Sequence, residues 1–329
     1  MVQAPKTRDI RRRQTLPPIR QSIGLGPGPD TEVHPLAHRA RVTVEDHPFH
    51  DTWLVHIPGT TADPTIFPPD RTLPQVAFDF RDLELNGAEP TDPYSHFNAL
   101  IESGLQRAFI GRNPKRLVFV GHSFGGMVSA NYLAETSLEE LQILVPGLEA
   151  VTLVMVCAAH RSPMDRYRIR SDMPIIGPIA TWLSHHVTRL GTQKRERLAA
   201  VMSLFGNEGP KPIWRQVWSR PDELTAVWDL PRASSIDHFW SVVRCAQEYD
   251  VGEKFLRAGA WFDLLVLSAE RDTQWPVDMF EDFWSLISDC GFERARWCHF
   301  PGDDHLSVAR QPTKYYKEIK DFLVALTSC

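Results

Sequence analysis

The chain has 329 residues, of which 43% are hydrophobic and 23% charged, and these ordinary proportions exclude a collagen, a coiled coil and a wholly disordered chain. Lysine and arginine number 36 against 41 aspartate and glutamate residues, so the net charge is −5, which argues against a nucleic-acid partner because such binding needs clustered positive charge. Five widely spaced cysteines offer neither a disulfide framework nor a paired zinc motif, and no apolar run is long enough to span a membrane, so we expect a cytoplasmic protein.

The first 30 residues differ from the rest of the chain. They hold six basic and two acidic residues, together with several prolines. We expect a flexible basic N-terminal arm over 1–30, or an extended strap lying on the domain. Mitochondrial targeting is the alternative, but Pro17 and Pro18 would break the amphipathic helix that it requires.

From residue 31 onward, strand patterns alternate with helix patterns. The predicted strands are 39–44, 51–57, 75–80, 117–120, 151–157, 262–268 and 294–300, and the predicted helices are 93–110, 127–135, 277–288 and 313–326. The strands over 117–120, 151–157 and 262–268 are continuous apolar runs, which are typical of parallel strands buried on both faces. This order predicts an α/β fold, with a mostly parallel twisted sheet and helices on both faces.

One long segment interrupts the alternation. Residues 159–260 show helical patterns without a convincing strand and hold five of the ten tryptophans of the chain. We interpret this segment as a helical lid inserted between the two parts of one core domain, 31–158 and 261–329. The tryptophans expected to line an apolar substrate pocket are Trp182, Trp214, Trp218 and Trp240.

The strongest chemical signal is Gly121-His122-Ser123-Phe124-Gly125-Gly126, which lies between an apolar strand and a helix. A serine hydroxyl is a poor nucleophile unless it is exposed, aligned with a base and close to donors for an oxyanion. A tight turn from strand to helix provides that setting, and glycines on either side allow the backbone to crowd there. The motif in this context resembles the nucleophile elbow of the α/β-hydrolase superfamily.

The resemblance implies a serine, an acid and a histidine in that order along the chain. Asp272 follows the strand over 262–268 and is the expected acid, whereas His305 follows the strand over 294–300 and is the expected base. Glu270 and Asp165 stay open as alternatives for the acid. The resemblance also implies an oxyanion hole, for which we expect backbone N–H groups of Phe124 and of Thr60 or Thr61.

These residues predict a serine hydrolase that cleaves an ester or thioester of a hydrophobic substrate through an acyl-enzyme. The sequence Gly-His-Ser-Phe-Gly-Gly also resembles thioesterases that release or cyclise acyl chains, and for these the partner would be an acyl carrier protein. A non-catalytic binding protein on the same fold is the third alternative. We expect no nucleotide cofactor, because no Walker or dinucleotide motif is present. We also expect no metal site, because His47 and His50 lie in a predicted turn and lack a distant third ligand.

Overall fold

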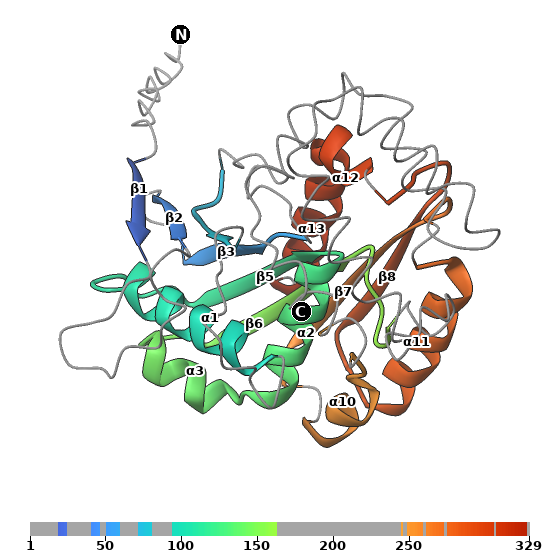
Figure 1. The fold of residues 1–329 in the computed structure, drawn as a ribbon, viewed down its shortest axis with the longest axis horizontal. Coiled ribbons are helices and arrows are strands. Elements are labelled where there is room, and N and C mark those ends of the chain that lie inside the picture. The colour runs from blue at the N-terminus through green and yellow to red at the C-terminus, as the bar shows by residue number, and fades with distance from the viewer. Residues whose placement is uncertain are drawn as a thin grey trace, which may run out of the picture.

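The computed structural model describes residues 19–24, 41–46, 51–59, 72–80, 94–162, 245, 249–258, 261–272, 275–305 and 307–327. These residues form one eight-stranded sheet with helices packed on it (Figure 1). The strands are β1 (Ile19–Gly24), β2 (Arg41–Asp46), β3 (Thr52–Ile57), β4 (Gln75–Asp79), β5 (Arg116–His122), β6 (Ala150–Val156), β7 (Asp263–Ala269) and β8 (Ala295–Phe300). The helices are α1 (Ser95–Ala108), α2 (Phe124–Glu135), α3 (Leu138–Leu144), α10 (Gly252–Ala258), α11 (Val277–Asp289), α12 (Ser307–Arg310) and α13 (Pro312–Thr327).

The sheet is mostly parallel, as predicted. Its strand order is β1-β2-β4-β3-β5-β6-β7-β8. The six strands from β4 to β8 in this order are parallel, whereas β2 is antiparallel to both β1 and β4. Because parallel strands share one direction, the carboxyl ends of β3, β5, β6, β7 and β8 lie along the same edge of the sheet, where ligands bind in open α/β folds.

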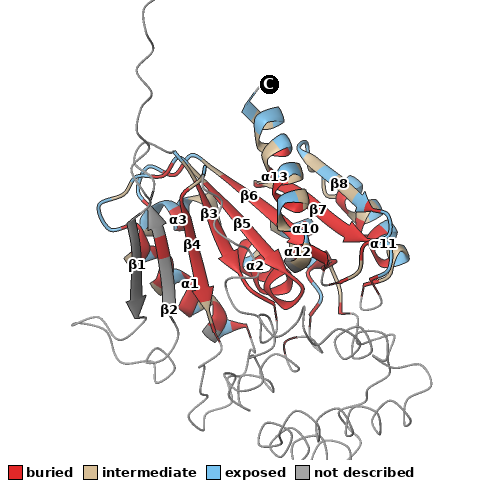
Figure 2. Ribbon diagram, turned by 90° about the horizontal axis from the view of Figure 1, so that it is seen from above, coloured by how far each residue is buried: buried red, intermediate tan, exposed pale blue. Residues whose placement is uncertain are grey.

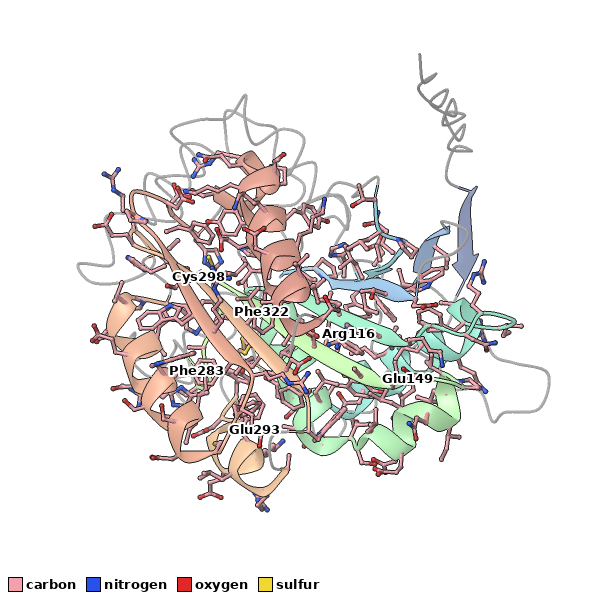
Figure 3. The ribbon with its side chains drawn as sticks, turned by 180° about the vertical axis from the view of Figure 1, so that it is seen from behind. Arg116, Glu149, Phe283, Glu293, Cys298 and Phe322 are labelled. Atoms are coloured by element: carbon pink, nitrogen blue, oxygen red, sulfur yellow. The ribbon has the colours of Figure 1, made fainter. Side chains whose placement is uncertain are left out.

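Both faces of the central strands are covered by helices, which confirms the predicted layering. On one face, side chains such as Phe119 and Leu153 pack with residues of α1, α2, α3, α10 and α11. On the other face, Val118 and Val154 pack with residues of α12 and α13. Successive side chains of a strand alternate between the two faces, so continuous apolar runs serve both cores. Figure 2 shows the central strands buried and β8 partly exposed, and Figure 3 shows α13 in front of the sheet when the molecule is seen from behind.

The first 30 residues are described only at Ile19–Gly24. These six residues form the strand β1, which pairs with β2 in antiparallel register at one edge of the sheet. These six residues therefore lie in the sheet, and the choice between an arm and a strap for 1–30 as a whole stays a prediction. The remainder of 1–30 lies outside the described residues.

Most of the predicted lid, residues 163–244, also lies outside the described residues. Its two flanks meet: Ser162 N–H donates to the Tyr249 carbonyl over 2.9 Å, and Val251 N–H donates to the His160 carbonyl over 2.9 Å. The segment thus leaves the core and returns to it at one place. Helix α10 follows this junction and contacts α2, and the extent of the lid, 159–260, stays a prediction. No helix among the described residues is long and apolar enough to cross a membrane.

Candidate active site

Ser123 lies at the carboxyl end of β5, directly before α2, in a turn held by a strained backbone. Its φ is 54° and its ψ is −119°, a conformation that costs a residue with a β-carbon about 1–3 kcal/mol. The Ser123 N–H donates to the Val156 carbonyl over 2.9 Å, and its own carbonyl accepts from Gly126 N–H over 2.9 Å. These bonds hold the residue in the strained geometry that the sequence motif predicts.

The glycines around Ser123 allow three pieces of backbone to come together. A β-carbon on Gly125 would lie 2.0 Å from the Ile57 carbonyl oxygen, and one on Gly121 would lie 2.4 Å from the Gly125 carbonyl oxygen. Both distances are far below van der Waals contact, and the atoms that would be met are backbone atoms. The glycine pattern of the motif is therefore explained by the closeness of β3, β5 and α2 at this turn.

The loop after β3 also reaches the elbow. A β-carbon on Gly59 would lie 3.1 Å from the His122 carbonyl oxygen and 3.4 Å from the Ser123 β-carbon. Phe124 is the first residue of α2, so its N–H has no acceptor within the helix, and it stays the expected oxyanion donor. The other expected donors, Thr60 and Thr61, lie outside the described residues.

His305 and Asp272 form a buried pair, although 33 residues separate them. His305 Nδ1 and Asp272 Oδ2 are 2.8 Å apart, and the exposed fractions of the two side chains are 5% and 0%. Asp272 follows β7 and His305 follows β8, so both lie at the carboxyl edge of the sheet that also carries Ser123. A carboxylate bonded to Nδ1 leaves the opposite ring nitrogen as the one that can exchange a proton.

The loops that carry the pair are tied to each other. Arg271 N–H donates to the Asp303 carbonyl over 2.7 Å, and Gly302 N–H donates to Glu270 Oε2 over 2.6 Å. The carboxylate of Asp303 in turn accepts from Lys314 Nζ over 2.8 Å and from the Tyr315 hydroxyl over 3.0 Å. The acid loop and the histidine loop are thus anchored together on α13.

Of the two alternative acids, Glu270 is described by the structure and Asp165 is not. The Glu270 carboxylate is engaged with the backbone of the histidine loop, and the residue is exposed, whereas Asp272 is buried and bonded to His305. Asp165 lies outside the described residues, as do the expected pocket residues Trp182, Trp214, Trp218 and Trp240.

His122 connects the serine to the histidine loop. Its Nε2 is 2.8 Å from the His305 carbonyl oxygen, and in the tautomer with the proton on Nε2 it donates to this oxygen. The centroids of the two imidazole rings are 4.9 Å apart. Burial, and then the charge of His305, lower the pKa of His122 to about 3. His122 is therefore a neutral neighbour of His305 at ordinary pH.

Cys157, which directly follows β6, lies beside the pair of His305 and Asp272. Ligand atoms of His122, Cys157 and His305 all lie within 4.8 Å of one another, and all three residues are buried. Burial raises the pKa of the Cys157 thiol well above its usual value, and the carboxylate of Asp272, to which the thiol donates, raises it further. Each of the two histidines uses one ring nitrogen in the bonds given above, His122 on the His305 carbonyl and His305 on the Asp272 carboxylate.

Two neighbours of the pair were not predicted from the sequence. Trp275 is buried, and its backbone N–H donates to Asp272 Oδ1 over 3.0 Å. Cys157 has a φ of 51°, which is unusual for any residue other than glycine. A signal for Trp275 was present, since it lies three residues after the predicted acid, but no pattern marked Cys157.

Comparison with known proteins agrees with this architecture. The model of the alpha/beta hydrolase family matches residues 54–318, which is most of the chain. No curated protein matches the sequence.

Solved structures share the fold at low sequence identity. A putative non-heme bromoperoxidase, BpoC, from Mycobacterium tuberculosis H37Rv is 13% identical with a TM-score of 0.53, and the alignment covers 96% of this chain and 99% of that one. A thermophilic esterase is 14% identical with a TM-score of 0.52 and coverages of 93% and 98%. An E-2-(acetamidomethylene)succinate hydrolase is 16% identical with a TM-score of 0.54 and coverages of 93% and 99%. Because the family model matches more than half of the sequence, the chain belongs to the alpha/beta hydrolase family.

Proposed function

We propose that this hydrolase cleaves an ester or thioester of a hydrophobic substrate, with Ser123 as nucleophile, His305 as general base and Asp272 as the acid of the triad. The observation that carries the proposal is the buried pair of His305 and Asp272, at 2.8 Å, on the sheet edge that presents the strained Ser123. A metal or a nucleotide is not required for this chemistry.

The roles follow from the positions of the groups. His305 takes the proton of the Ser123 hydroxyl as that oxygen attacks the carbonyl carbon, and it later returns a proton to the leaving alcohol or thiol. Asp272 holds the imidazole in the tautomer with the proton on Nδ1 and stabilises its protonated form. The Phe124 N–H at the start of α2 supports the negative charge that develops on the substrate oxygen.

The substrate class can be tested with a panel of oxygen esters and thioesters of graded chain length. We expect turnover that increases with acyl chain length, and Ser123→Ala should reduce it to background while the protein keeps its thermal unfolding transition. Turnover that persists in Ser123→Ala would contradict the assignment of the nucleophile. Turnover of thioesters alone, and best with a chain on an acyl carrier protein, would assign the enzyme to acyl-chain release.

A further inference from the structure

The Trp275 indole is stacked, with an offset, on the His305 imidazole. The two rings are stacked, with centroids 5.8 Å apart and planes only 15° from parallel. Trp275 is 2% exposed, so this contact is shielded from water. Its indole N–H donates to the Arg161 carbonyl over 3.5 Å, which fixes the ring against the segment that follows β6.

Trp275 also holds the partner of His305. Its backbone N–H donates to Oδ1 of Asp272, while Oδ2 of the same carboxylate bonds to His305. One residue thus contacts both members of the pair, through its backbone on the acid and through its ring on the base. A substitution of the side chain keeps the backbone bond, so the two contacts can be separated by experiment.

The ring contact bears on the charge that His305 carries during catalysis. The face of an indole is electron-rich and attracts a cation within about 6 Å of its centroid, most strongly where water is excluded. A stacked indole therefore favours the imidazolium over the neutral imidazole. In the proposed mechanism the imidazolium forms at the transition state, so the contact is stronger there than in the resting enzyme.

The other titratable groups that face His305 also bear on its charge, and each has a partner or is neutral. His122, from β5, stays neutral because its pKa is lowered to about 3, and Cys157, from β6, stays a neutral thiol because its pKa is raised. In the histidine's own loop, Asp303 is paired with Lys314 and Asp304 with Arg310. Asp272 and Trp275 both contact the His305 ring directly, the first through a hydrogen bond and the second through its indole.

We propose that Trp275 is a positioning residue for the proposed triad: its indole face orients the His305 ring and stabilises the imidazolium, while its backbone N–H orients Asp272. This inference rests on the proposed function, because it assigns a role through His305 acting as the base.

The test compares Trp275→Leu, which removes the aromatic face, with Trp275→Phe, which keeps a smaller one. The readout is kcat/KM for an activated ester as a function of pH. In Trp275→Leu the imidazolium loses its contact with the indole. The acid limb of the profile, where kcat/KM falls as the pH is lowered, should therefore move to lower pH by about half to one and a half units. The plateau should fall about threefold to thirtyfold, because the same loss weakens the transition state. Trp275→Phe should lie between the wild type and Trp275→Leu in both respects.

The matched control is Trp284→Leu, which removes a tryptophan of α11 that contacts Trp297 and not the site. It should leave the acid limb where it is in the wild type. An active Trp275→Leu enzyme whose acid limb lies at the wild-type pH would overturn the inference. A merely structural role would lower activity without changing the proton affinity of His305. If Trp275→Leu does not fold, the limb of Trp275→Phe decides in the same way.

The proposed function fails by a different result. A wild-type enzyme that turns over no ester or thioester, and whose Ser123 does not react with a fluorophosphonate, would overturn the triad and this inference with it. An active wild type with unchanged Trp275 variants would overturn the inference alone.

Discussion

Single residues at the carboxyl edge of the sheet carry the proposed chemistry, and their environments differ although their types are similar. Asp272 and Glu270 are two residues apart, yet one carboxylate is buried on His305 and the other accepts from the Gly302 backbone. His122 and His305 are in ring contact, yet only the second is bonded to a carboxylate at its Nδ1. The environment of each group, and not its type, decides what it can do.

Replacing Asp272 and Glu270 one at a time by their amides distinguishes their roles. Asp272→Asn should lower kcat by about a thousandfold or more, because an amide favours the wrong tautomer of His305 and does not stabilise its charged form. Glu270→Gln should keep kcat within about twofold, since its side-chain oxygen can still accept from Gly302 N–H. Steady-state kinetics on one activated ester would measure both. A larger loss in Glu270→Gln than in Asp272→Asn would transfer the acid role to Glu270.

The buried His122 predicts how stability depends on pH. Its pKa is about 3 in the folded protein and about 6.5 in an unfolded chain, so the unfolded state alone binds this proton between those values. The contribution of His122 to the free energy of unfolding is therefore complete above pH 6.5 and declines as the pH falls toward 3.

Urea unfolding of the wild type and of His122→Gln at about pH 7, 5.5 and 4.5 measures this effect. The wild type should lose more stability on acidification than the variant does, because the substituted side chain binds no proton. Equal losses in the two proteins would show that His122 does not titrate as its burial implies.

At the scale of elements, the turn between β5 and α2 depends on close backbone packing. Gly125→Ala should destabilise the protein by about 3 kcal/mol or more, because the added methyl group would lie 2.0 Å from the Ile57 carbonyl oxygen. The control is Gly291→Asn, where φ is 72°, an added β-carbon would meet no atom within 4 Å, and asparagine tolerates the left-handed backbone. Thermal unfolding would compare them, and a Gly125→Ala protein as stable as the control would contradict the described contact.

The core elements were well predicted from the sequence because their patterns are local. The apolar run at 117–120 and the Gly-His-Ser-Phe-Gly-Gly motif were sufficient to predict β5, the elbow and α2. Helix α3 was missed although Ser137 and Glu140 form a capping box at its start, a signal that is readable in the sequence. Strand β1 was not predicted, because it has few apolar residues and depends on pairing with β2.

The site was predictable only in part, for a physical reason. The order of Ser123, Asp272 and His305 is a property of the chain, so it could be predicted from the sequence. The stacking of Trp275 on His305, the thiol of Cys157 beside Asp272 and the bond from His122 to the His305 carbonyl depend on how separate loops meet. No spacing or composition encodes such contacts between loops.

At the scale of the whole molecule, the proposed active site lies at the carboxyl ends of the strands, and a largely buried ion pair lies at their amino ends. At the amino ends of the strands, Arg116 of β5 reaches across β6 to Asp263 of β7, with 2.6 Å between Nη1 and Oδ2 and side-chain exposures of 15% and 12%. Figure 3 shows Arg116 and Glu149 labelled near this edge. The nearby pair of Lys115 and Glu149 is much more exposed, at 46% and 66%.

This contrast predicts a difference between neighbouring substitutions. Arg116→Met should lower the free energy of unfolding by about 2 kcal/mol, because it leaves the largely buried Asp263 without its main partner. Lys115→Met should change stability little, since exposed pairs are screened by solvent. Both variants should keep the wild-type kcat, because the active edge is at the opposite ends of the strands. Urea unfolding measures the stability of both variants. A fall in kcat for either folded variant would contradict the prediction that kcat is unchanged.

The central claim is that Ser123 is a nucleophile activated by His305, and fluorophosphonate labelling followed by peptide mass spectrometry tests it most directly. The account predicts a single phosphonylated serine, Ser123, in the folded wild type, labelling at least about a hundredfold slower in His305→Gln, and none at this position in Ser123→Ala. A folded wild-type protein that leaves Ser123 unlabelled, or that is labelled at Ser123 equally fast without His305, would contradict the account.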